Sequence, residues 1–364
     1  MPTRFVRYSD DVEVVGPDED RIAEEIIATM RGESEVLLDR YRHATRPSHG
    51  KSHGLLKGEL KVHAGLPDTL AQGLFAAPRT FPVLARLSTI PGDILADSVT
   101  TQRGMSLKVI GPEGQAMLPG HEGEVTQDFL LDNGSRFPVA DAAGFLATIK
   151  GLAATTEKVE PLKVMVSTAA RVAKAALKTV GLDSANLDFF GHPPKHPLAD
   201  TYYSQAPIRY GDYVAKVSVA PTAETRAAAE AQGLDPHAGF SPLLAATVGF
   251  FKQHGAEFEF RVQLCTDLGR MPVEDASVEW PEEESPYRPV ARLSFPAQEA
   301  YSPERRVYFD DGLAFSPAHG LAAHRPLGSI MRARLKAYRP SARWRAEMNA
   351  QRRSEPRSLD GVPD

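Results

Sequence analysis

The sequence predicts an α+β fold, and three observations support this prediction. Short apolar or alternating segments cluster in the middle of the 364-residue chain. Segments with apolar residues at helical spacing come before, between and after them. Several neighbouring strand-like segments are joined by connections too short for a crossover helix, which makes their strands antiparallel. A chain of this length can bury a sizeable core and still hold a large cofactor.

Helical segments begin and end the chain. The stretch 18–30 has isoleucines at helical spacing and acidic residues in its first turn, and 34–42 predicts a second, short helix. Further helices are expected at 140–149, 163–180, 223–232, 241–254 and 326–350. The segment 163–180 also fits a membrane-surface helix, although its ordinary flanking sequence disfavours that alternative.

Seven strands are predicted between these helices. They are expected at 55–62, 81–88, 105–110, 126–131, 213–220, 257–265 and 290–295. The clearest alternation places Phe258, Phe260, Val262 and Leu264 on one face, as in a half-buried antiparallel strand. We expect an N-terminal helical arm at 1–45, a main domain at 46–350 and a polar, disordered tail at 351–364.

Composition narrows the class of function. Hydrophobic residues make up 42% of the chain, charged residues 24%, and the net charge is −5, so the basic footprint of a nucleic-acid-binding protein is missing. The Arg-rich stretch 332–353 has mixed charge and predicts a solvated helix face. The single cysteine, Cys265, fits a reducing compartment. No signal peptide or membrane-spanning segment is predicted, so we expect a cytoplasmic protein.

The most informative segment is Arg334-Leu335-Lys336-Ala337-Tyr338. Arg334 and Tyr338 are four residues apart on a predicted helix and therefore share one face. A guanidinium beside a phenol favours the phenolate, and a phenolate is a hard ligand suited to ferric haem. The same pair also fits an ordinary contact on a helix surface.

A second segment, 46–54, places two histidines just before a predicted strand. A neutral imidazole at a strand entrance can accept a proton from a substrate oxygen and return it. His49 and His53 also have the spacing of a metal pair on a helix, but Gly50 and Gly54 disfavour a helix there. A loop histidine without a role is the plainest interpretation of either residue.

A third segment combines Arg86 and Ser88, which alternation places on one side of a strand, with Arg103 in the next strand. The hydroxyl could fix an imidazole tautomer, and a cation could bind a carboxylate. A polar outer face explains the same pattern.

Taken in order, these segments resemble the catalase superfamily, and in particular its small bacterial haem-containing members. Arg46 to Lys51 is similar to the RxxHA[RK] motif, with Gly50 in place of Ala. The segment 86–89 is similar to RFST, and 103–108 to RGFAxK. The segment from Arg334 to Tyr338 is similar to the proximal tyrosine motif, although its Phe is Lys336 and the following acidic position is Pro340. The resemblance covers most of the chain.

The resemblance implies a closed antiparallel barrel of about eight strands wrapped by helices, with haem b at one side. It implies that Tyr338 ligates ferric iron and that Arg334 keeps Tyr338 ionised. It also implies that His49 is the distal acid/base, oriented by Ser88. The residues that the resemblance places near the cofactor are Arg46, Arg86, Arg103, Arg334, Phe129, Phe137 and His53.

Two departures from the family pattern bear on the site. The distal Asn of catalases falls at Val125 or Thr126, with Gln127 and Asn133 nearby, and none is clearly its equivalent. One extra residue after His49 leaves His53 as an alternative distal base.

The resemblance predicts a haem-dependent peroxidase or catalase that acts on hydrogen peroxide or an organic hydroperoxide, with an unidentified electron donor. A fatty-acid hydroperoxide rearrangement could use the same scaffold. The alternatives from other classes are a haem-binding or haem-sensing protein with little turnover and a lipid-binding barrel without haem. Thiolate ligation by Cys265 is disfavoured, because that residue ends an alternating strand. We expect a homodimer and no nucleic-acid or membrane partner.

Overall fold

A computed structural model describes residues 5–119, 123, 125–153, 193–353 and 355–364. The helix expected at 163–180 lies outside the described residues. The strands are β1 (Ser52–Val62), β2 (Thr80–Thr89), β3 (Arg103–Ile110), β4 (Thr126–Asp132), β5 (Tyr202–Tyr203), β6 (Ile208–Tyr210), β7 (Tyr213–Pro221), β8 (Ala256–Leu264) and β9 (Arg288–Phe295).

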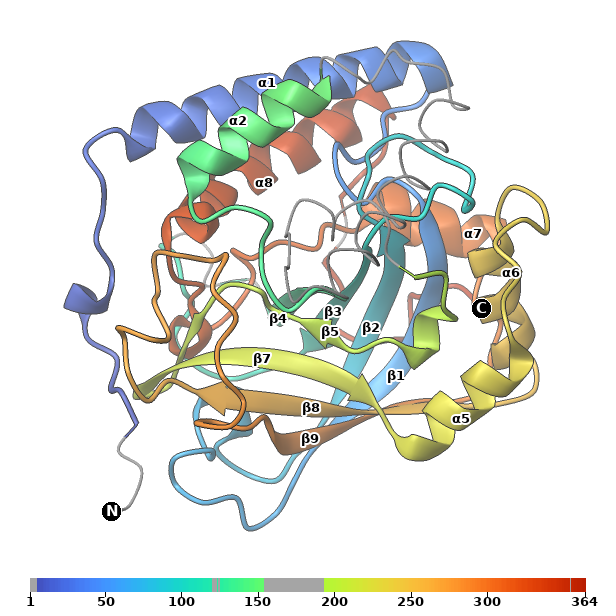
Figure 1. Ribbon diagram of the computed structural model, residues 1–364. Helices are drawn as coiled ribbons and strands as arrows, with labels where there is room; N and C mark the ends of the chain where they lie inside the picture. The colour runs from blue at the N-terminus through green and yellow to red at the C-terminus, as the bar shows by residue number, and fades with distance from the viewer. Residues whose placement is uncertain (1–4, 120–122, 124, 154–192, 354) are drawn as a thin grey trace, which may run out of the picture.

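These strands form one antiparallel sheet that closes into a barrel (Figure 1). The order is β5-β4-β3-β2-β1-β9-β8-β7-β6, and the additional pairing of β5 with β7 closes an eight-stranded ring. The expected α+β class and the closed antiparallel barrel are both confirmed. All seven predicted strands are present with bounds that differ by no more than three residues, whereas β5 and β6 were not predicted.

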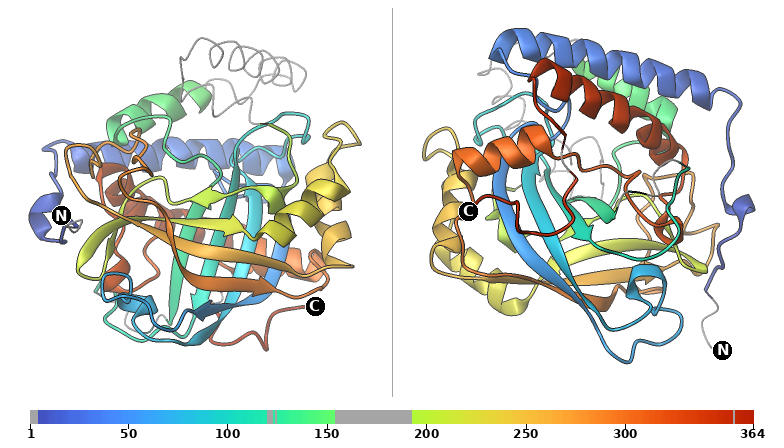
Figure 2. Two further views of the ribbon diagram at one scale, coloured as in Figure 1. Left: turned by 60° about the horizontal axis from the view of Figure 1, so that its bottom comes forward. Right: turned by 180° about the vertical axis from the view of Figure 1, so that it is seen from behind.

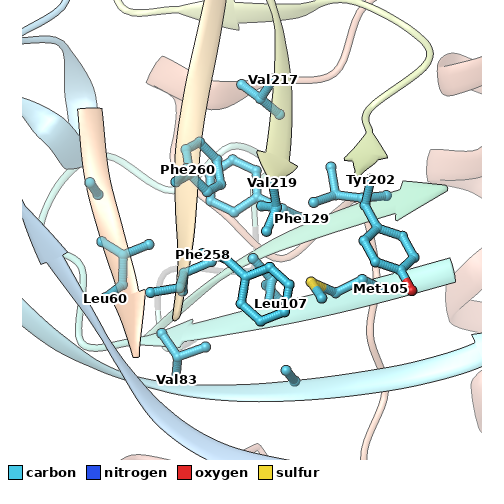
Figure 3. Packing of buried hydrophobic residues seen from close by; sticks show 14 of the residues in the cluster. Leu60, Val83, Met105, Leu107, Phe129, Tyr202, Val217, Val219, Phe258 and Phe260 are labelled. Atoms are coloured by element: carbon cyan, nitrogen blue, oxygen red, sulfur yellow. The ribbon is translucent and has the colours of Figure 1, made fainter. Parts of the chain in front are cut away.

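The barrel interior is filled by large apolar side chains (Figure 3). Phe258, Phe260 and Val262 of β8 are fully buried there, as the period-2 pattern predicted. Phe129 of β4 meets Phe260 edge-on at 4.8 Å between ring centroids. Because side chains fill the interior, a large ligand must be held outside the barrel wall.

Three helices form a layer across one side of the barrel (Figures 1 and 2). They are α1 (Glu19–Tyr41), α2 (Ala142–Ala153) and α8 (Ser329–Met348), and they share a small apolar cluster that includes Ile26, Leu146 and Ala333. The expected break between two N-terminal helices is wrong. Helix α1 continues past Gly32, and the Ser34 hydroxyl donates to the Met30 carbonyl within it.

The remaining helical elements cover other parts of the barrel. They are α5 (Ala223–Gln232), α6 (Pro242–Phe251), α7 (Pro303–Arg306), the π-helix η4 (Val307–Gly312) and the 3₁₀ turns η1 (Asp10–Val12), η2 (Gly73–Phe75), η3 (Pro197–Ala199) and η5 (Ala322–His324). No helix among the described residues is long and apolar enough to cross a membrane.

The polar tail packs against the barrel, which corrects the expectation of disorder at 351–364. Val362 is 6% exposed and belongs to an apolar cluster outside the barrel wall. Glu355 reaches the fully buried Lys108 at 2.9 Å, and Arg305 Nε donates to the Pro363 carbonyl. Composition misses these contacts because each depends on a partner far away in sequence.

Lys108 is the buried cation that pairs with the carboxylates of Asp128 and Glu355 on this outer surface. Its ammonium contacts both carboxylate oxygens of Asp128, the residue opposite it on β4, at 2.9 Å. Burial opposes the charge, yet Asp128 and Glu355 raise the pKa of Lys108 overall.

We expect Lys108→Met to lower the free energy of unfolding by roughly 3–5 kcal/mol, because it leaves the Asp128 carboxylate buried without its cation. Urea denaturation measures this change. The double variant Lys108→Met/Asp128→Leu should recover most of the loss. As a control, Arg7→Met breaks an exposed pair with Asp212 and should cost about 1 kcal/mol or less. A stable Lys108→Met single variant would contradict the assignment.

Candidate functional site

The candidate site lies on the outer face of β2, β3 and β4, beneath α8. Along these strands, alternate side chains point into the barrel and out of it. Paired residues on neighbouring strands project to the same face. Ser88 pairs with Gly104, which pairs with Asp132, so these three residues form one row across the outer face.

His49 reaches this row from a strained turn before β1. Its φ is +58°, a left-handed value that non-glycine residues adopt only when the surroundings fix it. The backbone N–H of His49 donates to the Ile90 carbonyl at 2.6 Å, and Arg86 Nη2 donates to the His49 carbonyl at 2.8 Å. These bonds hold the turn in place.

Glycines let the chain segments meet at this turn. A Cβ on Gly50 would lie 2.2 Å from the carbonyl oxygen of Gly92, and one on Gly92 would lie 2.4 Å from the Pro47 oxygen. The replacement of the motif Ala by Gly50 therefore has a steric reason.

The His49 ring lies over Gly104 and between its two neighbours in the row. A Cβ on Gly104 would meet the ring at 2.6 Å. Nδ1 lies 3.0 Å from Ser88 Oγ, and Nε2 lies 3.7 Å from Asp132 Oδ1. Burial, together with the Arg86, Arg334 and Arg46 guanidiniums, lowers the pKa of His49 to about 3, so the imidazole is neutral near pH 7.

Asp132 is the carboxyl group of the site, and the sequence analysis did not select it. Its Oδ1 is buried and has no hydrogen-bond partner. Burial raises the pKa of Asp132 to about 7, and Arg334 opposes that rise.

None of the residues considered for the distal amide lines this cavity. Asn133 donates to Asp200 at 3.0 Å, and its oxygen accepts from the Arg103 backbone. Gln127 accepts from the Leu321 backbone at 2.9 Å, and Thr126 lies beside Lys108.

Helix α8 supplies the groups on the opposite side. Arg334 Nη2 donates to the Tyr338 hydroxyl oxygen at 2.8 Å, so the residues four apart do share one face. Burial opposes the charge of Arg334, but the Tyr338 oxygen and Asp132 raise its pKa overall. The helix continues through Pro340, which is exposed.

A cluster of three guanidiniums lies at one end of the site. Arg46 and Arg86 both reach Asp310 Oδ1, at 3.1 and 2.7 Å. Arg46 Nη2 also donates to the Phe309 carbonyl at 2.7 Å, which ties it to η4. Burial would raise the pKa of Asp310, but the two guanidiniums lower it overall.

The third guanidinium, Arg345, has an unused donor. Its Nη2 donates to the Leu313 carbonyl at 3.0 Å, but its buried Nε has no acceptor among the described residues. Burial, partly offset by Asp310, lowers the pKa of Arg345 to about 10, and Arg86 adds repulsion. Three largely buried cations outnumber the two neighbouring carboxylates, Asp310 and Asp311, and this excess of positive charge favours an anionic ligand.

Two adjoining cavities meet at Tyr338. The smaller, about 40 Å³, is lined by His49, Asp132 and Arg334 among others. The larger, about 120 Å³, has an apolar wall beside Arg345. Four residues line both: Arg46, Ser48, Phe315 and Tyr338. A flat ligand that spans both cavities would have to displace side chains that line both.

The structure thus brings Arg46, His49, Arg86, Ser88, Arg334 and Tyr338 together. His53 is fully buried with both ring nitrogens unpartnered, and it does not line either cavity. Arg103 pairs with Asp200 at 2.7 Å, away from Tyr338.

The two predicted aromatic residues also lie outside the cavities. Phe129 points into the barrel core. Phe137 packs with Ile330 and Met331 and lies beside Arg334, whose Cζ is 5.9 Å from the ring centroid.

Asp132, Asp310 and Arg345 were missed by sequence reasoning. Arg345 had a usable signal, because it lies two helical turns after Tyr338 and so shares its face. Asp132 and Asp310 had none, because their positions depend on strand register and tertiary packing.

These residues fit a haem. A phenol oxygen beside a guanidinium suits ferric iron, the apolar wall suits a macrocycle, and the unused Arg345 donor suits a carboxylate. No cluster of three or more His, Cys, Asp or Glu residues that could hold a bare metal ion is found in the described part of the chain.

The fold is similar to that of catalases. A fungal catalase structure matches with a TM-score of 0.59 and 16% identity over 90% of this chain and 68% of that chain. Catalase A from Saccharomyces cerevisiae matches with a TM-score of 0.59 and 15% identity over 100% and 75%. A bacterial catalase matches with a TM-score of 0.56 and 14% identity over 98% and 70%. No protein-family model and no curated protein matches the sequence. The chain therefore has a catalase-like fold.

Proposed function

We propose that this protein is a haem-dependent oxidoreductase that acts on hydrogen peroxide or an organic hydroperoxide. One observation carries the proposal: the Tyr338 oxygen, held by Arg334, and the His49 ring, held by Ser88, line the same cavity. Such a pair can hold a metal on one side and move a proton on the other.

Each residue has a role in this proposal. Tyr338 would hold the iron, and the Arg334 cation would stabilise negative charge on its oxygen. Arg46, Arg86 and Arg345 would bind the carboxylates. Haem, when bound, supplies the redox chemistry.

His49 would accept the proton of the substrate O–H group. Because its pKa lies near 3, its Nε2 is free of charge near pH 7 and can accept a proton transiently. Ser88, bonded to Nδ1, fixes the orientation of the ring.

The family relation, cellular location, oligomeric state and electron donor of the protein are also part of the proposal. We propose a relation to the small bacterial catalase-related proteins that the sequence motifs resemble. The buried, unpaired Cys265 is compatible with a cytoplasmic location. A homodimer and an external electron donor complete the proposal.

A protein that binds or senses haem with little turnover is the second candidate. The observation in its favour is that, among the described residues, no amide side chain lines the cavity beside His49. Steady-state peroxide consumption by the haem-loaded protein separates the two candidates.

We expect the full-length protein supplemented with ferric haem to show a Soret band, and Tyr338→Phe to lose most of its haem on gel filtration, because the phenol oxygen is the only proposed iron ligand. Absorbance and the haem-to-protein ratio measure this. Tyr213→Phe, at the start of β7 beside Phe5, is the matched control. Equal haem retention by Tyr338→Phe and wild type would refute the ligand assignment.

We expect His49→Ala to retain haem but to consume peroxide roughly 10²–10⁴-fold more slowly, the usual contribution of a positioned acid/base. Initial rates of peroxide loss test this at equal haem loading. His237→Ala changes an exposed loop histidine and should leave the rate unchanged. A His49→Ala rate equal to that of wild type would remove His49 from the mechanism.

A further inference from the structure

Asp132 stands out among the buried charged groups on the outer face of the barrel. Elsewhere on this face Lys108 pairs with Asp128, and at the start of β3 the buried Arg103 pairs with Asp200. Asp132 Oδ1 is buried, unpartnered and directed at a cavity. A buried acceptor without a partner is costly, so this arrangement requires an explanation.

Strand register places Asp132 against the imidazole. Ser88 and Asp132 lie on either side of Gly104, and the His49 ring fills the space that a larger residue than glycine would take. Ser88 meets one ring nitrogen and Asp132 faces the other. The Ser88 contact at Nδ1 is a hydrogen bond of 3.0 Å, but 3.7 Å from Nε2 to Oδ1 is too long for one.

No atom fits on the line between two groups this close, but an oxygen to one side, in the adjoining cavity, can lie within hydrogen-bond distance of both. To satisfy both groups, the oxygen must donate to one and accept from the other. Water and the O–H end of a hydroperoxide meet this requirement, whereas an ether or a carbonyl oxygen does not.

The charged and titratable groups around Asp132 come from several elements. Arg334 of α8 opposes the rise in its pKa, and His49 faces it from the turn before β1. Arg46 and Arg86 line the same cavity. Tyr202 of β5 lies close enough for Asp132 to help raise its pKa, although burial is the larger cause. Tyr202 is thus uncharged near neutral pH.

We propose that Asp132 is a second acid–base residue of this site and acts with His49 on one shared oxygen of the bound hydroperoxide. The carboxyl gives its proton to that oxygen while the proton already on the oxygen passes to His49 Nε2. The bound molecule gains one proton and loses one, and an aspartate and an imidazolium result. The reverse transfer restores both neutral groups. This inference rests on the proposed function.

The first test uses the haem-free, full-length protein with ¹⁵N-labelled histidine, and the His49 resonances are assigned by their loss in His49→Gln. In wild type, the ring nitrogens should shift with a midpoint near pH 7, as Asp132 ionises beside a ring that stays neutral. Asp132→Asn should abolish that midpoint. Asp212→Asn, an exposed carboxyl paired with Arg7, should retain it. A midpoint that persists in Asp132→Asn, or is absent in wild type, overturns the pairing.

Thermal unfolding shows whether the variant is folded and gives an independent check. The folded-state pKa of Asp132 is raised above the ordinary value of 3.8, so the group destabilises the fold increasingly as pH rises toward 7. Asp132→Asn removes this penalty. Its melting temperature should therefore exceed that of wild type by more at about pH 8 than at about pH 5. An equal difference at both pH values counts against a raised pKa and overturns the acid role.

The second test uses haem-loaded protein and hydrogen peroxide. The wild-type rate should fall as pH rises through about 7, because the carboxyl loses the proton that it donates. Asp132→Asn should be at least about tenfold slower and should lack this pH step. An Asp132→Asn profile identical to that of wild type overturns the proposal. If haem-loaded wild type consumes no peroxide, the proposed function fails, and the histidine resonances still decide whether Asp132 and His49 interact.

Discussion

Arg86 is the side chain that joins the two halves of the site. It is 1% exposed, and its Nε holds Asp310 at 2.7 Å while its Nη2 holds the His49 carbonyl at 2.8 Å. Through these bonds it connects the π-helix η4 to the left-handed turn that presents the imidazole. Loss of Arg86 would leave the Asp310 carboxylate short of a cation and would release the strained turn at His49. The contacts that stabilise the fold here are therefore the same ones that position the candidate site.

The sequence predicted most of the barrel because its long strands are either continuous apolar runs or alternating segments. Strands β2, β3 and β7 are buried on both faces, whereas β8 and β9 leave one face partly exposed and alternate with period 2. The pattern in β8, with Phe258 and Phe260 inside, shows this clearly. The sequence pattern does not show which strands pair with each other, so the expectation of a closed barrel came from the family resemblance. The two residues of β5 are too few for a period, although their pairing with β7 closes the ring. The packed tail escaped prediction because its composition is polar and its partners, such as Lys108, are distant in sequence.

The residues of the candidate site likewise fall into two groups: those that local spacing predicts and those that only tertiary structure brings together. Arg334 with Tyr338, and Arg86 with Ser88, were predictable because local geometry alone places each pair on one face. Asp132 was not, because its place beside His49 depends on the register of three strands and on the absence of a side chain at Gly104. Which of His49 and His53 lies at the cavity likewise needed the structure. Both residues are loop or strand-entrance histidines in sequence, but only His49 lines the cavity.

His49 and Asp132 are displaced from their ordinary titration in opposite directions by the same burial. The imidazole has a pKa near 3 and the carboxyl one near 7, so near neutral pH the imidazole is neutral and the carboxyl is neutral in about half of the molecules. A sheet that pairs Lys108 with Asp128 two rows away could have paired Asp132 as well. The unpartnered Asp132 Oδ1 lowers the stability of the fold. Buried polar groups left without partners at the expense of stability are concentrated where a protein binds or transforms a ligand. His49 Nε2 and Asp132 Oδ1 then face the same small cavity. One ligand oxygen that donates a proton to one group and accepts a proton from the other would satisfy both.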